Sequence, residues 1–202
     1  MELHTERLLL RPYTKQDVSA VQSYAGNPLN VKYVLFGPNT LKETKQFIRN
    51  TIITNADKPR RNYDFLIEKK DDKKAIGGCG LYLQGKEEAE LGWILHIDYW
   101  NNNYTTEAAE ALICFGFVSL KLHRIYARCN GVNIGSWRVM EKCHMQKEAV
   151  FRQARRLRSD PEGAWYDEYQ YAILDADFTT LYPSEVISGF MRLNELPEDV
   201  SD

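Results

Sequence analysis

The feature of this 202-residue chain that most limits its fold is an abrupt change of hydrophobic period between positions 90 and 117. From Leu91 to Ile97 the residues are largely apolar, which predicts a β-strand covered on both faces. Three successive Asn residues follow at 101–103, and from Tyr104 the apolar residues recur at helical spacing. This succession of strand, tight polar loop and helix predicts a domain that mixes β-strands with α-helices.

The loop between this strand and helix has the chemistry of an anion site. The first turn of a helix carries unpaired backbone N–H groups and the positive end of the helix dipole. Asn tolerates the left-handed backbone that would turn these N–H groups inward, so the segment indicates a cradle for phosphate. A loop that merely joins a buried strand to a helix has the same pattern, and on spacing alone both interpretations stay open.

Charge and cysteine content bear on the class of protein. The chain has 26 Lys and Arg against 28 Asp and Glu, so its formal charge of −2 provides no general attraction to nucleic acid or to an anionic membrane. The four cysteines are far apart and read as reduced core thiols, and no His/Cys cluster has metal-site spacing. No apolar run approaches the roughly 20 residues of a membrane span, and the N-terminus lacks a signal-peptide pattern, so we expect a cytoplasmic protein.

The rest of the pattern predicts one domain over residues 1–175 and an extension over 176–202. Helices are expected after Thr14, after Thr40, at Tyr104 and at Ile134. The extension is expected to hold one short helix at Ser184–Leu193 and then a mobile acidic tail. About seven strands are expected, at 7–11, 63–68, 75–83, 91–97, 123–130, 145–151 and 165–174, with a polar loop over 152–163.

Five ordered motifs extend this pattern: T-E-R-L-x-L-R-P near the start, Y-W-x-x-x-Y-x-T-E-A at the Asn-rich loop, H-R-I-x-A-R-C, N-x-x-S-x-R-V-x-E-K and G-x-W-x-D-E. With them the chain resembles the GNAT acetyltransferase superfamily over roughly residues 3 to 174, and more narrowly the branch that contains ribosomal-protein N-terminal acetyltransferases. The resemblance implies a single GNAT-like α/β (α+β) domain. Its mixed central sheet would have flanking helices and a splayed central strand pair that holds acetyl-CoA.

The resemblance also implies where the cofactor binds. The pantetheine arm would pair with the strand backbone, and the pyrophosphate would lie on N–H groups of the loop and first helical turn. In this loop Asn101 and Asn103 replace residues that are usually Gly, so we expect Asn103→Gly to preserve or improve binding. The implied cofactor-binding residues are Trp93, Ile94, Leu95, Trp100, Asn101, Asn102, Asn103, Tyr104, Thr105, Thr106, Asn133 and Ser136.

Two catalytic roles follow from the same resemblance. Met140 stands where many members have a Tyr that protonates the leaving thiolate, so Ser136 is expected to donate to the sulfur and Glu148 to take the proton from the amine. The alternatives are that Asn133 and Ser136 only cap a helix and that Glu148 is a half-exposed strand residue paired with a neighbour such as Arg152. The basic run 152–158 is interpreted as a solvated hairpin.

The expected activity is transfer of an acetyl group from acetyl-CoA to a primary amine by direct attack, without an acyl-enzyme. The acceptor could be a protein N-terminus, a polyamine, an aminoglycoside or another small amine, and the protein a monomer or homodimer. The rival interpretation is a CoA-binding sensor or structural subunit with lapsed catalysis, motivated by the three Asn residues and Met140. A nucleic-acid-binding module is disfavoured by the near-neutral charge.

Overall fold

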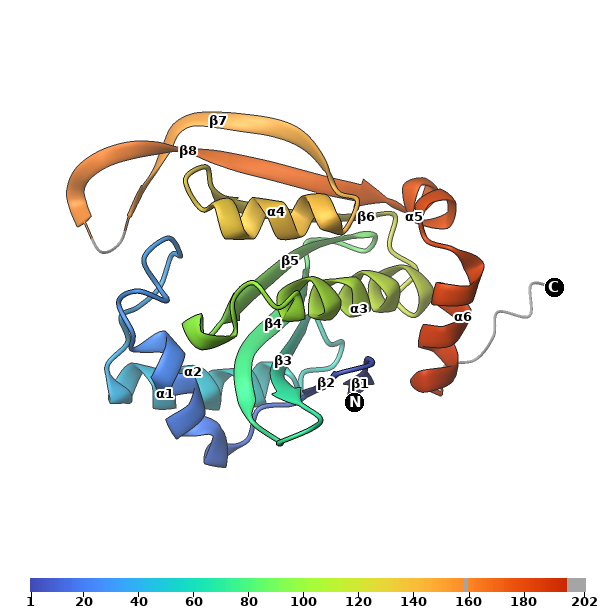
Figure 1. The fold of residues 1–202 in the computed structure, drawn as a ribbon, viewed down its shortest axis with the longest axis horizontal. Coiled ribbons are helices and arrows are strands. Elements are labelled where there is room, and N and C mark those ends of the chain that lie inside the picture. Colours follow the sequence, from blue (N-terminus) through green and yellow to red (C-terminus); the bar gives the residue numbers. More distant parts are fainter. Residues whose placement is uncertain (158–159, 196–202) are drawn as a thin grey trace.

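Eight strands form one sheet in the order β1-β2-β3-β4-β5-β6-β8-β7 (Figure 1). The computed structural model describes residues 1–157 and 160–195. All neighbouring strands are antiparallel except β5 and β6, which are parallel, so the predicted mixed sheet is confirmed, with β1 as an eighth strand. The strands are β1 (Leu3–His4), β2 (Leu8–Arg11), β3 (Asn62–Lys69), β4 (Ala75–Leu83), β5 (Glu88–Leu95), β6 (Arg124–Asn130), β7 (Gln146–Leu157) and β8 (Asp160–Leu174).

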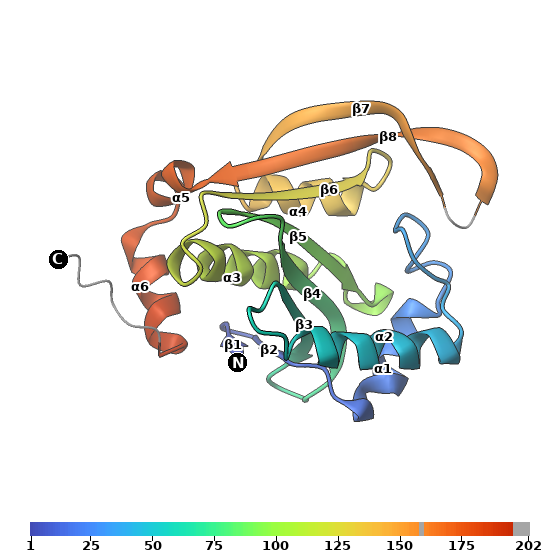
Figure 2. The ribbon, with the colours of Figure 1, turned by 180° about the vertical axis from the view of Figure 1, so that it is seen from behind.

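Helices cover both faces of the sheet (Figures 1 and 2). On one face α1 and α2 enclose a cluster that includes Tyr24, Ile48 and Leu66. On the other face α3 and α4 enclose the larger cluster, in which α3 is buried almost all round because nearly all its residues are apolar or small. The helices are α1 (Val18–Ala25), α2 (Leu41–Thr54), α3 (Tyr104–Val118), α4 (Ile134–Lys142), α5 (Asp175–Leu181) and α6 (Ser184–Leu193), with 3-10 helices η1 (Lys15–Asp17) and η2 (Ile97–Tyr99).

Residues 152–163 differ from the sequence-based prediction, because most of them are strand instead of polar loop. β7 runs on to Leu157 and β8 begins at Asp160, with register shifts along the pair. Cross-strand side-chain contacts explain the difference: the Arg156 guanidinium lies 4.5 Å from the centroid of the Trp165 ring, and Arg155 pairs with Glu168. The resulting long hairpin reaches over the segment that follows α1 (Figures 1 and 2).

The C-terminal segment packs on the domain. The predicted helix at Ser184–Leu193 is confirmed as α6, and α5 is an additional helix that the sequence pattern did not indicate. Phe178 and Tyr182 are buried in the larger core cluster, and Asn194 bonds through its side chain to both backbone groups of His4. The predicted acidic tail, residues 196–202, lies outside the described residues. Within the described ranges every helix is too short or too polar to cross a bilayer.

Candidate functional site

The central feature of the site is the point at which β5 and β6 separate. The two strands pair only from Glu88 with Arg124 to Glu90 with Tyr126. Beyond that point β5 stays paired with β4 and β6 with β8, so the predicted splayed pair is confirmed.

Backbone groups of β5 are left unpaired in this gap. The His96 N–H bonds to the Ile76 carbonyl of β4 at 2.8 Å, and peptide groups alternate in direction along a strand. The N–H groups of Trp93 and Leu95 therefore face the gap that β6 has left, whereas the peptide groups of Ile94 face β4. The Leu95 carbonyl accepts bonds from the Trp100 indole at 2.8 Å and from the Asn30 amide at 2.6 Å.

The Asn-rich loop has the backbone that its residues predict. Asn101 and Asn103 have φ values of 62° and 60°, in the left-handed region. The first bond of α3 runs from the Glu107 N–H to the Asn103 carbonyl at 3.0 Å, so the N–H groups of residues 104–106 precede the helical hydrogen bonds. These groups form the positive end of α3 next to the gap between β5 and β6.

Two cations on α4 line the same end of the site. The Lys142 ammonium donates to the Asn103 side-chain oxygen at 2.7 Å, and Arg138 lies one helical turn earlier on α4. Arg7 also donates to the Asn102 carbonyl at 3.1 Å, while its charge is paired with Glu107 of α3. Positive charge and N–H donors therefore converge on one loop, as an anionic ligand requires.

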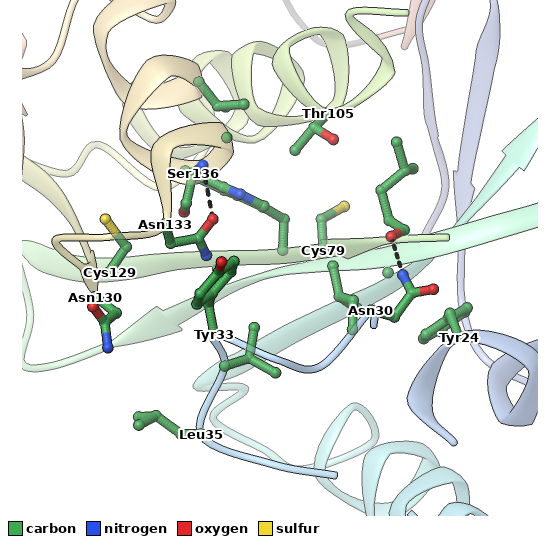
Figure 3. Close-up of a pocket in the computed structure, with 18 of the residues that line it drawn as sticks. Tyr24, Asn30, Tyr33, Leu35, Cys79, Thr105, Cys129, Asn130, Asn133 and Ser136 are labelled. Carbon is green, nitrogen blue, oxygen red and sulfur yellow. Dashed lines mark hydrogen bonds between the residues drawn. The ribbon is translucent and has the colours of Figure 1, made fainter. Parts of the chain in front are cut away.

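Asn133 and Ser136 begin α4 and face the gap (Figure 3). The Ser136 N–H bonds to the Asn133 side-chain oxygen at 3.3 Å, so Asn133 does cap the helix. Burial raises the pKa of the Cys129 thiol to about 11, an effect that the hydrogen bond from the Ser136 side chain and the charge of Lys147 partly oppose. The Ser136 side chain therefore lies close to the Cys129 sulfur, and both residues line the site.

A cavity of about 1070 Å³ connects these groups. It is slightly larger than the range of roughly 300–1,000 Å³ typical of small-molecule sites, so it has room for a cofactor together with an acceptor. All the residues predicted to bind the cofactor line it except Asn102, whose side chain instead bonds to the Tyr99 and Trp100 carbonyls. The groups present fit a long thiol ester with a diphosphate, because a strand edge, an N–H cradle and two cations follow one another along the cavity.

Glu148, predicted as the catalytic base, lies outside the cavity lining. Its carboxylate pairs with Arg124, which also pairs with Glu88. Arg124 and Glu88 face each other where β5 and β6 are still joined, so Glu148 is held over the closed part of the strand pair. The contacts of Glu148 thus fit the alternative interpretation, in which it is a strand residue paired with a neighbouring Arg. The partner is Arg124 and not Arg152.

Residues that the sequence did not single out supply the carboxylates of the cavity. Glu90 is the last β5 residue paired with β6, and Arg128 donates to both of its oxygens at 3.1 Å. Glu168 is 5% exposed and pairs with Arg155. Asp64 accepts a bond from the Tyr82 hydroxyl at 2.7 Å, and burial raises its pKa. These residues come from different strands, so no local pattern joins them. Within the described residues, no group of three or more His, Cys, Asp or Glu side chains could hold a metal ion.

Two departures from the expected motif have structural explanations. Met140 is 1% exposed and packs in the core. It occupies the position of the Tyr found in many members, but its thioether cannot act as a general acid. His144 stands just after α4, where helices commonly end on a Gly, and has φ of 59°; the Met145 N–H there bonds to the Met140 carbonyl at 3.0 Å.

Known proteins have similar sequences and a similar fold. The sequence model described as "Acetyltransferase (GNAT) domain" matches residues 7–146. An uncharacterized N-acetyltransferase of Bacillus subtilis, YnaD, is 35% identical over 88% of this chain and 99% of its own. The crystal structure of a GNAT-family acetyltransferase from Bacillus anthracis has a TM-score of 0.76 at 32% identity, covering 87% of this chain and 99% of that one.

Solved neighbours include complexes with the cofactor or its product. RimL, a ribosomal α-N-protein acetyltransferase, was solved in complex with coenzyme A disulfide-linked to one of its cysteines; it has a TM-score of 0.74 at 18% identity, covering 88% of this chain and all of that chain. At that identity RimL shows a shared fold. Together with the family match and the cavity that fits a diphosphate thioester, these findings identify acetyl-CoA as the cofactor. The chain is an acetyl-CoA-dependent acetyltransferase and belongs to the GNAT family.

Proposed function

We propose that the protein transfers the acetyl group to a primary amine by direct attack of the amine, without an acyl-enzyme. The observation that carries this proposal is one continuous cavity, which joins the N–H cradle and the free edge of β5 to a chamber lined by Glu90 and Asp64. A cofactor in one part of the cavity and an acceptor in the other would meet without passing through solvent. When bound, acetyl-CoA supplies an acetyl group activated as a thioester.

The cysteines support direct transfer. All four are buried, and burial raises the pKa of Cys114 to about 12 and that of Cys129 to about 11. Burial also raises the pKa values of Cys79 and Cys143. A thiol acts as a nucleophile in its ionised form, so none of these residues is suited to carry the acetyl group.

The remaining roles fall to groups around the gap. The unpaired N–H groups of Trp93 and Leu95 face the position where a carbonyl oxygen would develop negative charge. Ser136 supplies a hydroxyl for the departing sulfur. Glu90, where the strands part, is placed to take the proton from the attacking amine, directly or through water.

A comparison of Glu90→Gln with Glu148→Gln tests this assignment, because both variants remove one strand carboxylate that is paired with an Arg. We expect Glu90→Gln to lower kcat/KM on the order of 10²-fold near neutrality, with partial recovery at high pH where free amine is abundant. Glu148→Gln should keep the wild-type pH–rate profile. A loss of kcat/KM in Glu148→Gln together with a wild-type profile in Glu90→Gln would instead identify Glu148 as the base. Tight binding of acetyl-CoA without thiol release with any amine would favour the non-catalytic sensor.

A further inference from the structure

The side of the cavity opposite α4 is apolar. Tyr33 to Phe36, in the segment between α1 and α2, line it together with Phe47 of α2. Leu35 is 61% exposed, Phe36 37% and Phe47 39%. Figure 3 shows Tyr33 and Leu35 on a loop that faces Asn133 and Ser136 across the cavity. When an apolar group of a ligand covers apolar side chains that were exposed to water, the free energy falls and binding is stabilised.

This apolar wall is held in place at both ends. The Asn30 amide donates to the Leu95 carbonyl at 2.6 Å, and the Ile97 N–H donates to the Asn30 side-chain oxygen at 3.2 Å. At the other end the Asn39 N–H bonds to the Ala25 carbonyl at 2.8 Å, and the Gln22 amide donates to the Asn39 carbonyl at 2.8 Å. The wall is thus tied to β5 and α1 before any acceptor binds, which limits the entropy lost on binding.

The carboxylates of the cavity already have partners. Arg128 holds Glu90, Arg155 holds Glu168, and Tyr82 donates to Asp64. One ammonium group would compete with Arg128 for Glu90, whereas each further ammonium group would have to displace Arg155 from Glu168 or share Asp64 with the Tyr82 hydroxyl.

The arginine side chains of the cavity also disfavour binding of a ligand with several positive charges. Arg128, Arg155 and Arg156 all line the cavity, and burial together with the charge of Arg128 lowers the pKa of Arg155. The existing cations thus already repel one another near Glu168. A further fixed positive charge at this position would add to that repulsion.

From the wall and the charges we propose that the acceptor is a monoamine with an apolar group next to its amine, and that polycationic amines are poor acceptors. The inference rests on the proposed amine acetyltransferase function and narrows it. A free arylalkyl amine and the N-terminus of a peptide with an apolar first residue both carry this chemistry. Polyamines and aminoglycosides do not.

The experiment measures thiol release from acetyl-CoA by the full chain with a fixed panel of acceptors. Phenethylamine and a tripeptide amide that begins with Phe are the apolar monoamines and separate the two sources. A tripeptide amide that begins with Ser is the polar monoamine, and spermidine and an aminoglycoside are the polycations. We expect kcat/KM for the better apolar monoamine to exceed that for either polycation by more than about tenfold, the effect of roughly 50 Å² of apolar contact.

Variants of the wall separate this effect from the general reactivity of the amines. Leu35→Ser and Phe36→Ser should each lower the ratio of kcat/KM for the apolar monoamines to kcat/KM for the Ser peptide by about three- to tenfold. Leu29→Ser is the matched control, because Leu29 lies in the same segment and is 63% exposed but does not line the cavity. Polycations that outperform every monoamine, or wall variants that affect all acceptors equally, would overturn the inference while thiol release still supported the proposed function. Absence of thiol release with every amine would instead overturn the proposed function.

Discussion

The contact between Lys142 and Asn103 gives a quantitative prediction about cofactor binding. On sequence grounds a Gly at position 103 should preserve or improve binding, because Gly adopts positive φ without strain. In the structure the Asn103 side chain also accepts a bond from the Lys142 ammonium at 2.7 Å, so it holds a positive charge beside the N–H cradle. Asn103→Gly would relieve backbone strain and release that charge at once. These two effects act in opposite directions on binding.

Coulomb's law sets the size of the second effect. An ammonium about 6 Å from a phosphate charge contributes roughly 0.7 to 2.8 kcal/mol at effective dielectric constants of about 80 to 20. Taking about 1.4 kcal/mol, Lys142→Met should weaken binding of coenzyme A about tenfold. Asn103→Gly should weaken it about threefold, because the ammonium remains present but unfixed, and should leave the stability of the free protein unchanged or slightly higher. Asn103→Pro should abolish binding, because proline cannot adopt a φ of 60°.

Calorimetric titration with coenzyme A measures these effects, with Lys45→Met on α2 as a matched control for the loss of one exposed Lys. In the double variant the effect of Lys142→Met should shrink to about threefold, since the two residues act through one contact. The losses should also decrease at high salt. If Asn103→Gly and Lys142→Met both bind as the wild type does, the contact is an ordinary surface hydrogen bond and the reasoning is wrong.

Three further predictions concern other parts of the chain. Ser136→Ala should lower kcat, and raising the pH should not restore it, because the lost hydroxyl acts on the sulfur and not on the amine; a pH–rate profile checks this. Phe178→Ala should lower the free energy of unfolding by about 3 to 5 kcal/mol in urea titration, since Phe178 is 3% exposed and packs on Phe117 with ring centroids 4.9 Å apart. For Asp17, burial would raise the pKa, but hydrogen bonds from Arg11 and Thr14 outweigh it and lower the pKa. The stability that ionised Asp17 provides is therefore complete above its ordinary pKa of 3.8 and lost as pH falls through the lower folded value. The advantage of the wild type over Asp17→Asn should accordingly shrink in urea titrations as pH is lowered from 7 to 3.

The backbone of the candidate cofactor site could be predicted from sequence because its determinants are local. The strand at 91–97, the Asn residues at 101 and 103 and the start of α3 at Tyr104 are consecutive, and their periodicity and backbone preferences act over a few residues. Asn133 and Ser136 are also local, as the first turn of α4. The structure confirms the backbone that these patterns predict, and the splay then follows from where β5 and β6 stop pairing.

The acceptor half could not be predicted in this way because it is assembled across the chain. The pairing of Glu90 with Arg128 depends on the register of β5 and β6, which no short motif specifies. Residues 152–157 look like a solvated loop in sequence, yet contacts with Glu168 and Trp165 hold them as a strand. Propensity was overridden there by tertiary pairing.

This division between local and assembled determinants has a chemical consequence. A cofactor that many proteins bind can be held largely by backbone groups, since N–H donors and a free strand edge do not depend on side-chain identity. On the proposed function the acceptor would, in contrast, meet side chains from the segment after α1, from α2 and from the β7–β8 hairpin, all of which contribute to the cavity lining. Substitutions in those three segments would change which amine is acetylated while the cradle and the edge of β5 stayed intact. The apolar wall at Leu35 and Phe36 is therefore the part of the cavity in which the specificity of this chain would be expressed, and the arginines of β7 are the part that would exclude competing polycations.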